Sequence, residues 1–83
     1  MPGSRLVLTV DVEEWFHVCG HPTYDVPERW CSFPSRVAPA TGRILDLLAR
    51  TSSRATFFVL GWVARRHPAL VREIVGAGHE VGC

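Results

Sequence analysis

Three carboxylates gather near the start of the chain, in the segment LVLTVDVEEWF at residues 6–16. Side chains alternate in direction along an extended backbone, so Asp11 and Glu13 are expected to point the same way and Glu14 the opposite way. Two carboxylates on one side of a strand end can divide a hydrolytic task, because one can bind a metal ion while the other takes a proton from water. A solvated loop that carries acids without chemistry is the alternative interpretation.

The run that precedes these acids, residues 6–10, is apolar and β-branched. Such a run predicts a strand covered on both faces, and we expect it to lie centrally between its neighbours in a parallel sheet. In parallel α/β proteins, ligands and chemistry gather at the carboxyl ends of the strands. The three acids and Trp15 would therefore lie at the functional edge of the sheet.

A long irregular segment, residues 16–39, follows the acids. Its prolines exclude a continuous helix or a central strand, and its aromatic residues argue against disorder. We predict an ordered loop packed over the end of the first strand. Its aromatic residues could contact substrate, but the favoured interpretation is that Trp30 and Phe33 only anchor the loop to the core. The prolines are Pro22, Pro27, Pro34 and Pro39.

This loop carries two histidines, His17 and His21, spaced as H-x-x-x-H with Cys19 between them. On a helix that spacing places both imidazoles on one face, as a zinc site requires. Pro22 removes the helix that would align them, so metal binding by this pair is not expected. We predict instead that His17, close to the acids, contacts substrate together with Trp15.

The remaining chain alternates helices and strands. The pattern predicts a helix capped by Thr41 and ending near Thr51, with an apolar stripe formed by Ile44, Leu45, Leu47 and Leu48. It then predicts a strand over 54–60, a short helix over 62–67, a helix that begins at Pro68 and is capped by Gly78, and a strand over 79–82. This order favours an α/β fold with parallel βαβαβ connections, the length of about a third of a (β/α) barrel of ~250 residues.

Composition excludes several classes of function. The 83 residues are 47% hydrophobic and carry a net charge of +1, so no strong field attracts nucleic acid or an anionic membrane. No G-x-G-x-x-G, P-loop or G-x-S-x-G motif is present. No apolar run approaches a membrane span, and the start lacks the pattern of a signal peptide, so we expect a cytoplasmic protein with its three cysteines as free thiols.

Three segments together resemble the NodB-homology polysaccharide deacetylases of carbohydrate esterase family 4, in particular the branch found with exopolysaccharide gene clusters. The segments are TVDVEEWFHV at 9–18, RATFFVLGWVARRHP at 54–68 and AGHEVG at 77–82. They occur in the order and spacing of that family. The resemblance implies that residues 1–83 are the N-terminal portion of such a domain, a truncated part of a deformed (β/α) barrel.

The resemblance also implies an activity and a set of roles. Members of the family hydrolyse N-acetyl groups from the amino sugars of polysaccharides and use a divalent metal, usually zinc. By their positions in the motif, Asp11 would be the catalytic base and Glu13 a metal ligand, with Glu14 the less expected ligand. The G-H-E histidine, His79, would lie at the amino end of its strand, and we interpret it as structural.

The chain departs from the family pattern where it ends. In the family, G-H-E is followed by H-x-x-x-H, whose histidines complete the metal site, whereas this sequence stops at Cys83. We therefore expect the 83 residues to be inactive by themselves. Two alternatives stay open: an allantoinase-like or cyclic-imide hydrolase of the same barrel, and a non-catalytic βαβ binding module.

Overall fold

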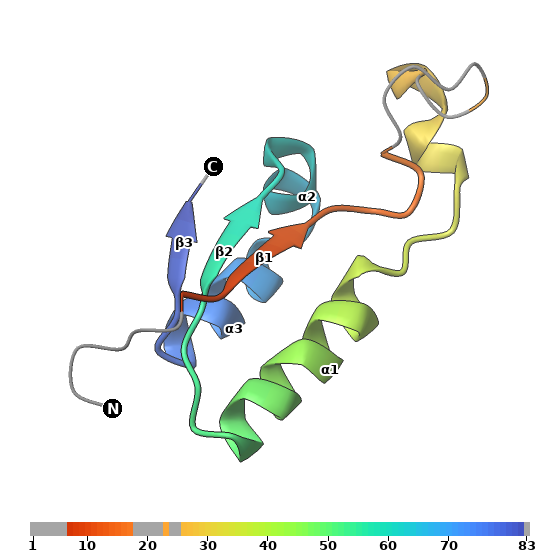
Figure 1. Ribbon diagram of the computed structural model, residues 1–83. Coiled ribbons are helices and arrows are strands. Elements are labelled where there is room, and N and C mark those ends of the chain that lie inside the picture. The colour runs from red at the N-terminus through yellow and green to blue at the C-terminus, as the bar shows by residue number, and fades with distance from the viewer. Residues whose placement is uncertain (1–6, 18–22, 24–25, 83) are drawn as a thin grey trace.

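The computed structural model describes residues 7–17, 23 and 26–82, and their core is a parallel three-stranded sheet (Figure 1). The strands are β1 (Thr9–Val12), β2 (Thr56–Val59) and β3 (Glu80–Gly82). Helices connect β1 to β2 and β2 to β3, as expected because parallel strands need a crossover connection. The predicted α/β class is confirmed, and the arrangement is that of a βαβαβ portion of a barrel.

The first strand does not lie between its neighbours, because the order in the sheet is β1-β2-β3. The expectation of a central first strand is therefore wrong. Consecutive elements tend to be adjacent in space, so each connection sets the next strand beside the last and the middle strand becomes the central one. The register aligns Asp11 with Phe58 and Phe58 with Gly82.

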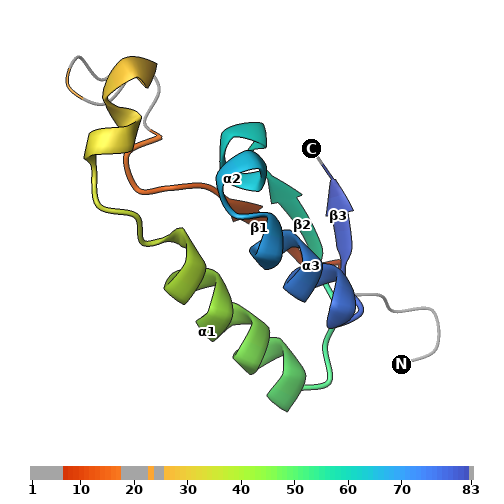
Figure 2. The same ribbon diagram turned by 180° about the vertical axis from the view of Figure 1, so that it is seen from behind.

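All three helices contribute side chains to one apolar core on a single face of the sheet. Figure 2 shows α2 (Gly61–Arg66) and α3 (Pro68–Gly76) in front of the strands, with α1 (Val37–Arg50) alongside. The buried residues of this core are Val12, Val37, Leu48, Ala55, Phe57, Val59, Val63, Leu70 and Ile74. Within the described residues, no helix is both long and apolar enough to span a membrane.

The opposite face of the sheet is open among the described residues. Thr9, Asp11 and Glu80 are exposed there, and Phe58 is 43% exposed. The prediction that the first strand is covered on both faces is thus wrong for this part of the chain, and β1 itself begins at Thr9, leaving Val7 78% exposed. Polar residues at alternate positions explain the difference, because they suit a face without apolar cover.

Helix α1 starts earlier than the sequence predicts. It begins at Val37, and Thr41 is buried inside it rather than capping it. Pro39 is tolerated because it falls in the first turn, where backbone N–H groups have no partner within the helix. The N-cap residue is Arg36, whose side chain makes no capping hydrogen bond. The other end agrees with the prediction, since Thr51 is the C-cap.

The last helix and strand follow the sequence closely. Helix α3 begins at Pro68, and Gly78 has a φ of 91°, the left-handed conformation predicted for it. His79 is buried, and its Nδ1 accepts a hydrogen bond of 3.0 Å from the backbone N–H of Ala55. The contact ties the start of β3 to the start of β2, in keeping with a structural role for this histidine.

Candidate active site

Asp11 and Glu13 share one side of the chain at the carboxyl end of the sheet. Both are exposed, whereas Val12, which lies between them, and Glu14, which follows Glu13, are buried. Asp11 and Glu13 also line a single cavity of about 200 Å³, together with residues 58–60 at the end of β2. This placement agrees with the strand alternation inferred from the sequence, and it leaves both carboxylates accessible to water.

Glu14 has a different task, because its carboxylate caps helix α1. Its side chain is fully buried, and Oε1 accepts hydrogen bonds from the backbone N–H groups of Arg36 at 2.8 Å and Val37 at 3.0 Å. The Ser35 hydroxyl donates to Oε2. Glu14 therefore supplies the cap that Arg36 lacks, and a carboxylate next to a helix N-terminus is favoured by the helix dipole.

The junction between α2 and α3 also reaches this carboxylate. His67 Nε2 lies 3.4 Å from the Ser35 hydroxyl and 4.0 Å from Glu14 Oε2. Glu14 thus links the end of β1 to the start of α1 and to the turn before α3. These contacts commit Glu14 to the fold and separate it from the exposed pair, Asp11 and Glu13.

His17 closes a tight turn with Glu14. The backbone N–H of His17 donates to the Glu14 carbonyl at 3.1 Å, and the backbone N–H of Glu14 donates to His17 Nδ1 at 2.9 Å. Because Nδ1 accepts, the proton of the neutral ring is on Nε2, which is buried and has no hydrogen-bond partner among the described residues. Burial lowers the pKa of His17 below its ordinary 6.5, against the opposing effect of the Glu13 and Glu14 carboxylates.

The ring of His17 lies among aromatic side chains rather than in open solvent. Its centroid is 4.4 Å from that of Trp30 and 5.1 Å from that of Trp62. One ring nitrogen is occupied and the other is buried, so the geometry favours a structural role. Substrate contact by His17 stays a prediction. His21 and Cys19, the other members of the spaced pair, lie outside the described residues.

Phe16 is the centre of a second, aromatic core beneath the loop. It is fully buried, and rings from the loop, from the 3₁₀ helix η1 (Pro27–Ser32) and from α2 surround it. They belong to Trp15, His17, Trp30, Phe33 and Trp62. The rings of Trp30 and Phe33 both lie against that of Phe16, so the predicted anchoring of these two residues is confirmed.

Trp15 is 41% exposed and borders a second cavity, of about 370 Å³, beside the acids. Its indole N–H donates to the Pro34 carbonyl at 2.8 Å, and the Arg36 guanidinium lies 5.7 Å from the ring centroid. Glu13 lines this cavity as well as the one it shares with Asp11. Substrate contact by Trp15 stays a prediction.

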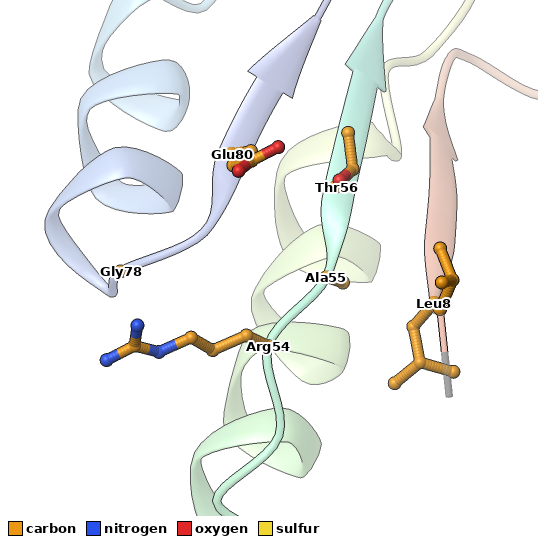
Figure 3. Close-up of a pocket in the computed structure, with 7 residues that line it drawn as sticks. Leu8, Arg54, Ala55, Thr56, Gly78 and Glu80 are labelled. Atoms are coloured by element: carbon orange, nitrogen blue, oxygen red, sulfur yellow. The ribbon is translucent and has the colours of Figure 1, made fainter. Parts of the chain in front are cut away.

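A larger cavity, of about 550 Å³, lies at the opposite end of the sheet (Figure 3). Arg54 extends below Gly78 there, and Thr56 and Glu80 lie on neighbouring strands. These residues mark the amino ends of β2 and β3. The cavity is therefore remote from Asp11 and Glu13.

The described residues do not form a complete metal site. They contain no group of three or more histidine, cysteine, aspartate or glutamate side chains that could hold an ion. Zinc in proteins takes three or four protein ligands, so Asp11 and Glu13 by themselves do not fit it. A zinc site at this edge of the sheet would need ligands beyond these two carboxylates.

Parallel βα units with two exposed carboxylates at the carboxyl end of β1 make this an α/β protein, consistent with a portion of a (β/α) barrel, and comparison gives its family. The family model described as polysaccharide deacetylase matches residues 23–83, more than half of the chain. The chain belongs to this polysaccharide deacetylase family. The matched segment begins after Asp11 and Glu13, so their roles stay predictions. No solved structure gives a significant match.

Curated relatives of the chain are much longer than it is. A peptidoglycan-N-acetylglucosamine deacetylase of Bacillus cereus is 35% identical over 68 residues, covering 76% of this chain and 32% of the relative. A chitooligosaccharide deacetylase of Rhizobium leguminosarum bv. trifolii is 54% identical over 41 residues, covering 49% of this chain and 19% of the relative. The chain therefore spans less than a third of the length of these relatives.

Proposed function

We propose that the chain is the N-terminal part of a hydrolase that removes N-acetyl groups from the amino sugars of a polysaccharide. The observation that carries this proposal is the joint placement of Asp11 and Glu13 on one cavity at the carboxyl end of the sheet, in a member of the polysaccharide deacetylase family. The names of the relatives, which specify peptidoglycan N-acetylglucosamine and chitooligosaccharide, support the substrate class.

The proposal gives a role to each of three exposed residues, Asp11, Glu13 and Trp15. Asp11 is the general base, because its carboxylate is exposed at the strand end where a water molecule can reach it. A positioned base contributes about 10²- to 10⁴-fold to the rate of such a reaction. Glu13 supplies one of the ligands for the divalent metal of the family. Trp15 packs against a sugar ring next to the acetamido group.

The 83 residues are proposed to be inactive by themselves. The described part of the chain offers two exposed carboxylates at the site, where a zinc hydrolase uses three protein ligands.

The test is acetate release from N-acetylated chitooligosaccharides, measured in parallel for the 83-residue chain and for the complete product of its reading frame. We expect turnover only by the complete product, in the presence of a divalent metal. Robust turnover by the 83 residues would refute the proposed inactivity. A complete product that hydrolyses cyclic imides or allantoin but releases no acetate would refute the deacetylase assignment.

A further inference from the structure

Arg36 stands at the edge of the cavity that Glu13 and Trp15 line. Two contacts fix its place. Its backbone N–H donates to Glu14 Oε1 at 2.8 Å, and its guanidinium lies over the Trp15 ring at 5.7 Å. Trp15 is itself held by the hydrogen bond from its indole N–H to Pro34. The guanidinium is therefore placed beside the cavity by the same residues that form its wall.

The charge of this guanidinium is not neutralised by a carboxylate in the described part of the chain, where Arg36 forms no ion pair. The buried carboxylate of Glu14 already accepts from two backbone N–H groups and the Ser35 hydroxyl. His17, which also lines the cavity, offers no exposed cationic group there, because its Nδ1 accepts from the Glu14 N–H and its Nε2 is buried. Arg36 is thus the one cationic side chain among the described residues that line this cavity.

We propose that Arg36 recognises a carboxylate-bearing sugar unit next to the N-acetylated unit, and so makes the protein selective for acidic polysaccharides. A planar guanidinium can donate two parallel hydrogen bonds to a carboxylate, which gives specificity as well as affinity. The cation–π contact of Arg36 with Trp15, at 5.7 Å, uses none of the guanidinium N–H donors. The cavity volume, about 370 Å³, lies within the range of small-ligand sites, roughly 300–1,000 Å³.

The geometry also assigns an order to the two sugar units. Glu13 borders both cavities, and its negative charge repels a carboxylate placed against it. The acidic unit therefore occupies the Arg36 side of the cavity, and the N-acetylated unit lies toward Asp11. This assignment rests on the proposed function, since it takes the acetylated sugar to be the unit at Asp11.

The test compares two oligosaccharides of equal length binding to the 83-residue chain. One is neutral tetra-N-acetylchitotetraose, and the other is a tetrasaccharide that alternates N-acetylglucosamine with glucuronic acid. The probe is the indole N–H resonance of Trp15, assigned from its loss in Trp15→Phe. We expect the acidic oligosaccharide to bind at least about fivefold more tightly at low salt, and this preference to shrink as salt rises.

Matched variants separate recognition from folding. Arg36→Ala should abolish the preference for the acidic ligand, and Arg36→Lys should restore part of it. Arg43→Ala, an exposed arginine on the same helix, should leave the preference intact. Helix content measured by circular dichroism checks that α1 persists in each variant.

Binding of both ligands with equal affinity, or an unchanged preference in Arg36→Ala, would overturn the role of Arg36 and leave the proposed deacetylase function standing. If neither oligosaccharide binds, the proposed Arg36 site on this chain is wrong. The deacetylase function itself fails only in the separate acetate assay, so the two failures are distinguishable.

Discussion

The backbone N–H of Arg36 lies 2.8 Å from Oε1 of Glu14 and donates a hydrogen bond to it. This one contact joins the end of β1 to the start of α1 across 22 positions of the sequence. It fixes the backbone next to Glu13 and, at the same time, sets the Arg36 side chain beside Trp15. Glu14, the less expected metal ligand from the sequence, thus positions the residues on either side of the candidate site.

Replacing Glu14 should destabilise the fold. Glu14→Ala leaves the N–H groups of Arg36 and Val37 and the Ser35 hydroxyl without their acceptor, so the free energy of unfolding should fall by about 2–4 kcal/mol. Glu14→Gln keeps an acceptor oxygen and loses mainly the favourable interaction of charge with the helix dipole, about 1 kcal/mol. Urea denaturation followed by circular dichroism measures both.

The matched control for this prediction is Glu73→Gln, which changes an exposed glutamate on α3. It should leave the stability nearly unchanged. If Glu14→Ala were no more destabilising than Glu73→Gln, the capping role of Glu14 would be wrong.

Acid should weaken the turn that His17 closes. The folded state favours the neutral ring, because burial lowers the pKa of His17 and Nδ1 must accept from the Glu14 N–H. The pKa in the unfolded chain is about 6.5. The contribution of His17 is therefore fully present above that pH, and it is lost as the pH falls from about 6.5 toward the lower pKa of the folded state.

The measurement for His17 is the free energy of unfolding as a function of pH for the natural chain and for His17→Asn. Subtracting the two curves removes the effect of the other histidines. The difference should decrease as the solution is acidified below pH 6.5. A difference that is constant with pH, or one that grows on acidification, would show that His17 is not held neutral.

Two glycines near the end of the chain should respond in opposite ways to alanine. Gly78 has a φ of 91°, so Gly78→Ala should cost about 1–2 kcal/mol of stability. Gly76 lies in α3, and a Cβ built there meets no atom within 4 Å, so Gly76→Ala should stabilise by about 0.5–1 kcal/mol. The measurement is the melting temperature of each variant relative to the natural chain. Equal shifts of the same sign would contradict the left-handed turn at Gly78.

Much of the fold could be predicted from the sequence because local signals specify it. Pro68 marks the start of α3, Gly78 marks the turn after it, and the apolar run around Phe57 marks β2. The position of β1 at the edge could not be obtained in this way, since strand order depends on how distant elements pack. The start of α1 could not be obtained for a similar reason, because Glu14 provides its cap from another part of the chain.

The site was predictable in part for the same physical reasons. The period of a strand is enough to group Asp11 with Glu13 and to set Glu14 apart, and the structure agrees with that grouping. Arg36 gives no signal, because nothing in a lone arginine before a helix indicates that it will lie over Trp15. The inward orientation of His17 is also hidden in the sequence, since it depends on aromatic rings from η1 and α2.

The central claim is that Asp11 is the base of a deacetylase, and one measurement tests it most directly. Acetate release from N-acetylated chitooligosaccharides is followed for the complete product of the reading frame and for its Asp11→Asn variant, with Asp46→Asn on α1 as the control. The variant should keep its fold and lose at least about 100-fold in kcat, while the control keeps its rate. Undiminished acetate release by Asp11→Asn would contradict the claim.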